Sequence, residues 1–387
     1  MSTTEIAAAP ASPGELTTEF LTHVLRSHQQ AYSPAEKTVL EVKEFTWKPL
    51  DVGVISEVVG IQALVAVGSA TEDKQYVAKF LRPEFPFEKM FVVESNFYTH
   101  FCGQTASLMP FQLPTCVYTS KSLIILERVG AIKTIKCVDG CPEEKIEDIV
   151  AKMAQMHARF RDSQLSSLAS PAGIGAELSG EAKREQFPSA WQPFLDDVVL
   201  ESSDKVRLAA ICERLSAKPQ TLEGLHEKVA TGPKAFIHGD FHVANMLFPT
   251  QQSEKNDSSS FWLLDWATCG EGNAMRDLAF FFIVSVHSTH RRKLEAACLK
   301  IYSDTAAKEG WNNYSLAQWQ QFYRMCVWNQ LAILIVYDSL TKHLVANAKS
   351  DKLKTELDHH FREVNYRACL AALDNFRDED FAALSSL

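Results

Sequence analysis

The pattern of hydrophobic and polar positions changes once along the chain, near residue 130. Before that point, short stretches rich in β-branched and aromatic residues are separated by polar turns, which predicts β-strands. The predicted strands are residues 38–47, 62–67, 75–81 and 122–127, with a polar turn at residues 69–74. Residues 88–101 carry apolar side chains at helical spacing, so we expect a helix between the third and fourth strands.

Beyond residue 130, apolar positions recur at helical spacing almost throughout. The predicted helical stretches are residues 149–160, 190–229 with a break at Pro219, and 277–376. One short buried strand is predicted at residues 262–266, after a polar surface loop at residues 251–260. The most apolar runs, residues 278–286 and 331–337, are too short to span a bilayer and predict buried helices.

The N-terminal residues are rich in Ala and Pro, which predicts a disordered tail. A helix is expected to begin directly after it, with Ser12 as N-cap, Pro13 in the first turn and Glu15 at the capping-box position. The apolar face of this helix would consist of Phe20, Leu21, Val24 and Leu25. The expected organisation is a tail at residues 1–12, a strand-rich first lobe at 13–127 and a helical second lobe at 128–387.

The composition narrows the class of protein. With 387 residues, 46% of them hydrophobic and 22% charged, the chain is typical of a globular protein. The formal charge of -9, without a basic stripe, argues against a nucleic-acid binder. Nine scattered cysteines without a CxxC pair indicate reduced thiols, and the start of the chain shows no secretory signal. We therefore expect a cytoplasmic protein without a membrane span.

The stretch FIHGDFHVANMLF, residues 236–248, places polar side chains between two short apolar segments, residues 236–237 and 246–248. We call these two segments the apolar clamps. A core strand would not tolerate unpaired polar groups, and a surface loop would not need the clamps. Asn245 follows Asp240 by five positions, the spacing of the carboxylate and carboxamide in kinase catalytic loops. The clamps are expected to hold a catalytic loop on a rigid core.

Phosphoryl transfer also requires ligands for a metal ion and a cation that binds the nucleotide phosphates. Three further residues match these requirements. Asp265 follows an apolar strand, where kinases place a metal-binding aspartate. Lys79 stands in Tyr-Val-Ala-Lys, which matches the strand lysine of kinases, and Glu94 in the next helix can pair with it. Taken alone, Lys79 and Glu94 are more typical of ordinary surface residues, whereas Asp240, Asn245 and Asp265 are hard to explain structurally.

The motifs YVAK, ES..FY, IILERVG, MHARF, HGDFHVANMLF, LLDWATCG and RDLAFF occur in this order. This order resembles the aminoglycoside/choline-kinase-type phosphotransferases, and most closely their ecdysteroid-kinase-like (CHK-type) branch. The resemblance covers most of the chain. It implies an α+β, bilobal protein-kinase-like fold with a small β-rich N-lobe and a large helical C-lobe.

The resemblance also implies roles for the residues at matching positions. Asp240 would be the catalytic base, and Asn245 and Asp265 would bind Mg²⁺. Lys79 would anchor the α- and β-phosphates of ATP, with Glu94 as its partner.

Further contacts with the nucleotide are implied for Gly53 and Ser56, which would meet its phosphates. The sequence around them lacks the glycine-rich signature of protein kinases, which leaves those contacts open. The backbone from Glu127 to Val129 would form the hinge that meets adenine. Asp277 would be a scaffold carboxylate behind the catalytic loop.

The predicted function is an ATP- and Mg²⁺-dependent kinase that phosphorylates a hydroxyl of a small, steroid-like or other neutral alcohol. Two alternatives stay open: a choline, ethanolamine or aminoglycoside kinase, and a catalytically inactive nucleotide-binding regulator. A protein kinase is disfavoured, because Trp266 and Ala267 replace the Phe-Gly that follows the metal-binding aspartate in those enzymes.

Overall fold

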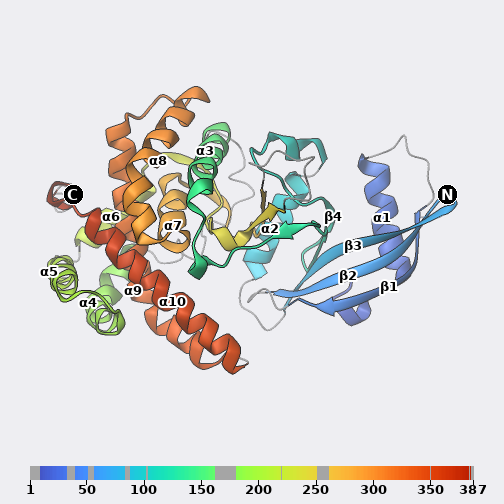
Figure 1. Cartoon of the computed structure of the whole chain (residues 1–387), viewed down its shortest axis with the longest axis horizontal. Helices are drawn as coiled ribbons and strands as arrows, with labels where there is room; N and C mark the ends of the chain where they lie inside the picture. Colours follow the sequence, from blue (N-terminus) through green and yellow to red (C-terminus); the bar gives the residue numbers. More distant parts are fainter. Residues whose placement is uncertain are drawn as a thin grey trace. The chain divides into compact units, whose positions relative to one another are not determined.

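The structure, a computed structural model, describes residues 9–32, 40–50, 56–82, 88–101, 103–161, 180–218, 220–250, 261–348, 350–382 and 384. The chain forms two compact units (Figure 1). Unit 1 comprises Met1–Ile132 and Phe248–Ala267, and unit 2 comprises Lys133–Leu247 and Thr268–Leu387. Most of the predicted tail, residues 1–8, and the predicted loop at residues 251–260 lie outside the described residues.

Unit 1 contains a five-stranded antiparallel sheet in the order β1-β2-β3-β5-β4. Its strands are β1 (Leu40–Pro49), β2 (Ser56–Val67), β3 (Ala70–Leu81), β4 (Cys116–Thr119) and β5 (Leu123–Glu127). The predicted turn at residues 69–74 is wrong, because Gly68, with φ of 63°, makes a tighter turn and β3 already begins at Ala70. The exposed polar residues that follow pair with β2, so they form the end of a hairpin. The pattern of hydrophobic and polar residues did not predict the short strand β4.

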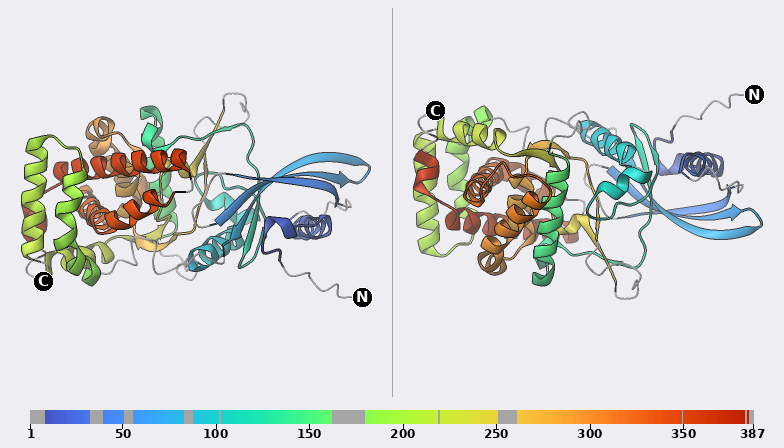
Figure 2. Two further views of the ribbon diagram at one scale, coloured as in Figure 1. Left: turned by 90° about the horizontal axis from the view of Figure 1, so that it is seen from below. Right: turned by 90° about the horizontal axis from the view of Figure 1, so that it is seen from above.

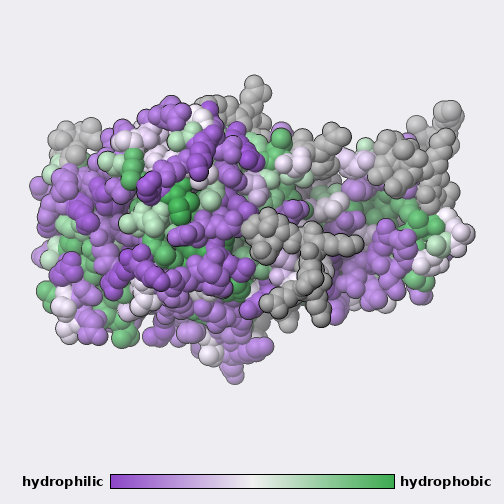
Figure 3. All heavy atoms as spheres, turned by 45° about the horizontal axis from the view of Figure 1, so that its top comes forward, coloured by the Kyte–Doolittle hydropathy of each residue, from purple (hydrophilic) through white to green (hydrophobic). Residues whose placement is uncertain are grey.

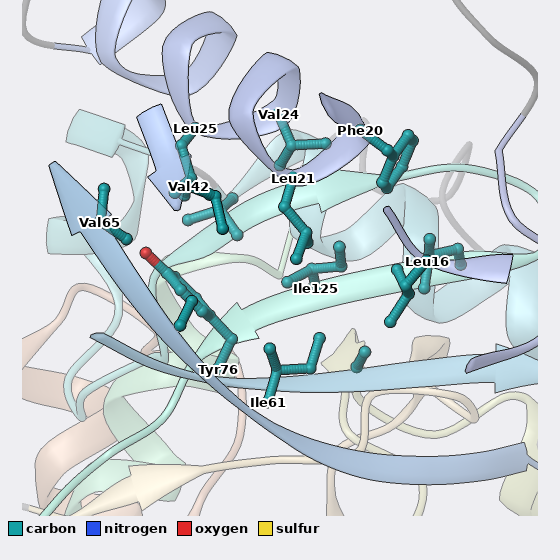
Figure 4. Close-up of a cluster of buried hydrophobic side chains, with 14 of the residues drawn as sticks. Leu16, Phe20, Leu21, Val24, Leu25, Val42, Ile61, Val65, Tyr76 and Ile125 are labelled. Carbon is teal, nitrogen blue, oxygen red and sulfur yellow. The ribbon is translucent and has the colours of Figure 1, made fainter. Parts of the chain in front are cut away.

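Helix α1 (Thr18–Tyr32) covers one face of this sheet, as Figure 4 shows. The predicted apolar face of the helix is confirmed: all four of its side chains are buried, in one cluster with residues from β1, β2, β3 and β5. The hydroxyl of Thr22 also accepts a hydrogen bond of 2.8 Å from the backbone N–H of Val42, beside a bulge in β1. The predicted helix start is wrong, since Pro13–Glu15 form a separate 3-10 turn and Ser12 bonds the side chain of Glu15 rather than a backbone N–H.

Aromatic stacking fixes the segment that returns to unit 1 after residue 247. The fully buried ring of Trp266 stacks on Phe97 of α2 (Glu88–His100), with ring centroids 3.9 Å apart and planes 7° apart. Phe111 packs against Phe261 at 5.6 Å. The same segment contains β9 (Trp262–Leu263), which belongs to a small sheet in the order β6-β8-β9, together with β6 (Ile132–Lys133) and β8 (Met246–Pro249).

Unit 2 is mainly helical, as predicted, and its helices are seen from two sides in Figure 2. They are α3 (Glu143–Arg159), α4 (Gly180–Asp197), α5 (Ser202–Ala217), α6 (Gln220–Ala230), α7 (Met275–Ser285), α8 (Ser288–Lys308), α9 (Leu316–Ala346), α10 (Asp351–Asp374) and α11 (Asp378–Ala382). Strands β7 (Lys234–Ile237) and β10 (Gly270–Asn273) pair antiparallel. The two apolar runs expected to form buried helices lie in α7 and α9, which is confirmed.

In the part of the chain that the structure describes, no helix combines the length and apolar character needed to cross a membrane. On the face shown in Figure 3, hydrophilic residues dominate the coloured surface and apolar residues occur in small groups between them. The described cysteines are all buried; they are Cys116, Cys137, Cys141, Cys212, Cys269, Cys298, Cys326 and Cys369.

Candidate active site

Lys79 of β3 lies between two carboxylates in unit 1. Its Nζ is 2.6 Å from Oε1 of Glu94 in α2 and 3.5 Å from Oδ1 of Asp265. The Glu94 side chain is only 4% exposed, whereas that of Asp265 is 47% exposed. Three segments distant in sequence therefore place one cation and two anions together, and Asp265 is the acid that solvent reaches.

The charges of these groups depend on one another. Burial alone would lower the pKa of Lys79, but the negative charges of Asp265 and Glu94 outweigh it and raise the pKa. The ammonium group is therefore fully charged at neutral pH. Because Glu94 is buried and hydrogen-bonded to Lys79, it fixes the direction of the lysine side chain.

Asp265 adopts a left-handed backbone conformation, with φ of 65°. The strand predicted to reach Trp266 is therefore too long, because β9 ends at Leu263 and the chain then turns. The turn lets Trp266 enter the core, where its Nε1 donates to the Leu263 carbonyl at 3.2 Å, while the Asp265 carboxylate stays accessible. Aspartate tolerates this conformation better than most residues, and backbone strain of this kind is frequent at functional sites.

The loop that carries Asp240 lies in unit 2. Strand β7 ends at Ile237, and the predicted apolar clamp before the loop is confirmed as buried strand. Gly239 follows with φ of 83°, and a Cβ atom there would lie 2.4 Å from the backbone oxygen of Thr268. Only glycine fits this backbone and this close approach. The clamp after the loop is β8, which follows the turn Val243–Asn245.

One oxygen of the Asp240 carboxylate receives two contacts. Asn245 Nδ2 lies 3.2 Å from Oδ2, and His242 Nε2 lies 3.3 Å from the same atom. Asn245 Nδ2 also donates to the Asp240 backbone oxygen at 3.0 Å. Within the described residues, Oδ1 of Asp240 has no hydrogen-bond donor, so this oxygen is open to a ligand.

The surroundings keep Asp240 ionised. Burial would raise its pKa, but the charge and hydrogen bond of His242, the charge of His238 and the hydrogen bond from Asn245 lower the pKa to about 2. Burial would likewise lower the pKa of His242, yet the charge of Asp240 raises it well above its ordinary value. His242 therefore forms an ion pair with Asp240 at neutral pH.

The buried carboxylate of Asp277 holds the backbone of this loop. It accepts hydrogen bonds from the N–H groups of His238 at 2.7 Å and Gly239 at 2.9 Å. His157 Nε2 lies 3.1 Å from the same carboxylate, and His157 Nδ1 lies 2.8 Å from the hydroxyl of Tyr302. Burial would raise the pKa of Asp277, but the hydrogen bond and charge of His157, with the charge of His238, lower it. A chain of hydrogen bonds thus runs from Tyr302 to the loop.

Sequence reasoning missed His157 and Tyr302. The available signal was the position of His157 on α3, where the other residues of the same helical face, Ile149, Met153 and Met156, are apolar. A histidine in such a stripe needs buried hydrogen-bond partners, and here both ring nitrogens have one.

Tyr302→Phe should lower the free energy of unfolding by about 1–2 kcal/mol, because it leaves the buried Nδ1 of His157 without its partner. Urea denaturation at neutral pH measures this. Tyr366→Phe is the matched control, since this tyrosine is exposed and its hydroxyl has no hydrogen bond to the described residues. Equal stability of Tyr302→Phe and the unaltered protein would contradict the role given to the chain of hydrogen bonds.

The predicted hinge lies at the end of β5. The N–H of Glu127 bonds the Thr115 carbonyl at 2.8 Å, while the backbone of Val129 makes no hydrogen bond within the described residues. Its N–H and C=O are therefore unoccupied as donor and acceptor among the described residues. Ser56 is buried at the start of β2, and Gly53 lies outside the described residues.

Comparison with known proteins gives a family model, described as the ecdysteroid kinase-like family, that matches residues 55–309. No curated protein matches this chain in sequence. The structure is similar to a choline kinase from Cryptosporidium parvum (TM-score 0.54, 10% identity), covering 96% of this chain and 99% of that one. It is also similar to a microcompartment-associated aminopropanol kinase (TM-score 0.53, 13% identity), covering 93% of this chain and 99% of that one. A third similar structure is an ethanolamine kinase from Plasmodium vivax (TM-score 0.51, 10% identity), covering 91% of this chain and 87% of that one. The likeness confirms the predicted α+β, protein-kinase-like fold.

Proposed function

Because this chain belongs to the ecdysteroid kinase-like family and is a phosphotransferase that acts on a hydroxyl group, we propose that it transfers the γ-phosphoryl group of ATP to a small neutral alcohol. The observation that carries the proposal is the cluster of Lys79, Glu94 and Asp265, assembled from three separate segments. An oriented ammonium group beside an accessible carboxylate suits the binding of nucleotide phosphates and their metal ion.

The donor atoms fit Mg²⁺, which prefers oxygen ligands and usually takes only one or two carboxylates from a protein. Asp265 offers a half-exposed carboxylate. The Nδ2 of Asn245 is bound to Asp240, which leaves the amide oxygen available for a cation. Among the described residues, no group of three or more His, Cys, Asp and Glu side chains could hold a metal ion by itself. When bound, Mg²⁺ would neutralise charge on the phosphates.

The chain's own residues would divide the work as follows. Lys79, held by Glu94, binds the α- and β-phosphates and withdraws negative charge from them. Asp240 receives the hydrogen bond of the acceptor hydroxyl on its open Oδ1 and takes the proton as the new bond to phosphorus forms. With a pKa of about 2, this carboxylate accepts the proton late, which agrees with a loose transition state for phosphoryl transfer.

The charges in unit 2 favour a neutral acceptor. Sites for cations usually need several carboxylates or an aromatic cage. Of the acids in the C-terminal helices, Asp338 and Glu363 are mostly buried and paired, with Lys342 at 2.6 Å and Arg367 at 2.7 Å. The acids Asp304, Glu356 and Asp358 are about half exposed and form weak surface pairs. Among the described residues of unit 2, the cation paired with Asp240 is His242, at 3.3 Å. An ammonium group would therefore gain little here.

A largely apolar or polyhydroxylated neutral alcohol should outcompete choline, ethanolamine and aminoglycosides as acceptor. Competition assays with pure protein and labelled ATP, resolving the products by mass, measure the preference directly. Efficient phosphorylation of choline without any of sterol-like alcohols would contradict this prediction and favour the alternative suggested by the similar choline and ethanolamine kinases.

A screen of alcohols with labelled ATP tests the proposed function itself. The variant Asp240→Asn serves as the inactive control in the same assay. Transfer of label to at least one alcohol, abolished in the variant, is the expected result. If ATP stabilises the protein against heat but no alcohol and no water receives the phosphoryl group, the chain is a nucleotide-binding regulator instead.

A further inference from the structure

Unit 2 contains a cavity of about 520 Å³ that none of the side chains assigned above lines. This volume lies within the range of small-molecule sites. The cavity is lined by Arg161, Thr231, Gly232, Lys234, Glu271, Trp311, Asn313 and Tyr314. They come from the end of α3, the start of β7, β10 and the segment between α8 and α9. Nothing in the proposed reaction uses it.

The charged residues of the cavity favour an anion. Among the described lining residues, Arg161 and Lys234 are basic and Glu271 is acidic. Arg161 is fixed by donating from Nη1 to the carbonyls of Ala158 at 2.6 Å and Glu309 at 3.4 Å. Lys234 pairs with Glu271 at 3.2 Å, but both side chains are about half exposed, so this pair is weak and can exchange partners.

The lining of the cavity also contains a rigid aromatic part. Trp311 is buried and packs edge-on against Trp319, with ring centroids 5.0 Å apart, and against Tyr314 at 6.1 Å. Asn313 and Thr231 add neutral hydrogen-bonding groups. A lining that combines two basic side chains with fixed aromatic rings suits an anionic head group attached to a ring.

Two direct connections join this cavity to the catalytic loop. Lys234 begins β7, and the residue after β7 is His238, whose N–H is held by Asp277. Arg161 follows α3, the helix that places His157 against the same carboxylate. The two segments are joined to each other, because the N–H of Phe236 bonds the Phe160 carbonyl at 3.3 Å. A ligand that pulls Arg161 and Lys234 together would therefore act on both supports of the loop.

We propose that this cavity is an effector site that binds a small organic anion, a phosphate or carboxylate group carried on a ring, and that its occupancy changes the activity set by the catalytic loop. The binding part of this inference does not depend on the proposed reaction. The shared chemistry is the anionic head group, and the test distinguishes its two forms.

Isothermal titration calorimetry with phenyl phosphate and with benzoate tests binding to the full chain. Inorganic phosphate and benzyl alcohol serve as probes for the head group and the ring alone, and both should bind more weakly than the combined ligand. Whichever of phenyl phosphate and benzoate binds more tightly identifies the head group. Failure of both to bind, or binding of inorganic phosphate as tight as that of phenyl phosphate, would overturn the proposal.

Variants separate this cavity from any other phosphate site. Lys234→Gln should weaken binding by about five- to tenfold, as expected for loss of one charged contact, while Glu271→Gln should strengthen it by removing the competing acid. Lys300→Gln is the matched control, because Lys300 also pairs with an acid on the surface, at 2.6 Å and 64% exposed. Unchanged affinity in both cavity variants would place the ligand elsewhere and overturn the site.

The effect of the bound anion on the catalytic loop is measured separately. One measurement is turnover at saturating anion; the other is hydrogen exchange of the His238 and Gly239 amides, which needs no substrate. A change of either quantity that is lost in Lys234→Gln supports the coupling. Binding that leaves both quantities unchanged would overturn the effector role, whatever the acceptor of the reaction is.

Discussion

Asp240→Asn is expected to lower turnover by about two orders of magnitude or more, the usual cost of removing a general base, without abolishing binding of MgATP. Asparagine has nearly the same shape, so it can still receive the hydrogen bond from Asn245. It cannot take up a proton, and it removes the charge that pairs with His242. A group needed only in the transition state lowers turnover and leaves ground-state binding in place.

Asp265→Asn should behave differently, because its carboxylate is assigned to the metal ion. Asparagine tolerates the left-handed conformation found at this position, so the backbone and the stacking of Trp266 should persist. The substitution then removes one negative charge from the metal site and from the surroundings of Lys79. Turnover and the Mg²⁺-dependent part of the stabilisation by ATP should both be lost.

Thermal unfolding with ATP, with and without Mg²⁺, distinguishes the two variants. Asp304→Asn is a suitable control, since Asp304 is an exposed acid paired with Lys300 and has no assigned role in the reaction. If Asp240→Asn and Asp265→Asn show the same loss of binding and of turnover, the separate roles of the two aspartates are wrong.

Lys79→Met is the second substitution expected to have a large effect. Methionine fills the space of the lysine stem but lacks the charge that would bind the phosphates, so turnover should fall by about two orders of magnitude. The buried Glu94 would lose its cation and gain a proton, which keeps the fold intact at a moderate cost in stability. Steady-state kinetics and circular dichroism measure the two effects.

Glu94→Gln should reduce turnover less, by about tenfold, because the ammonium group remains but loses its strongest guide. Lys74→Met provides the control on the same strand, since the Lys74 side chain is 37% exposed and its ion pair among the described residues is with Glu72 at 3.5 Å. Activity of Lys79→Met equal to that of Lys74→Met would remove the basis for assigning the nucleotide phosphates to unit 1.

Much of the local structure could be predicted because the signal is local. The apolar clamps around Asp240 are strands, and the helical face of α1 is buried as its spacing indicates. Glu94 shows the limit of this reasoning. Helical spacing gives no reason to bury a glutamate. Its side chain is nearly inaccessible because it pairs with Lys79 of β3 and accepts a hydrogen bond from the Trp266 backbone.

The conformation of Asp265 could not be read from the sequence for a similar reason. The residues from Phe261 to Trp266 are apolar enough to extend a strand, and that pattern led to a strand that is too long. The chain turns because Trp266 gains a stacking partner in Phe97, which belongs to a distant helix. Local propensity loses to burial of a large aromatic ring. The hydrogen bonds between His157, Asp277 and Tyr302 are likewise contacts between distant helices.

Unit 1 is assembled from two separate stretches of chain, and this has a consequence for synthesis on the ribosome. A nascent chain that has reached Ile132 contains β1 to β5 and α2, so Lys79 and Glu94 can already meet. Trp266 and Asp265 follow only after residues 133–247 have been made. Until then the ring of Trp266 does not cover Phe97, and transiently uncovered apolar surface of this kind favours aggregation. A chain stopped before residue 261 therefore lacks both Trp266, which stacks on Phe97, and Asp265, the accessible acid beside Lys79.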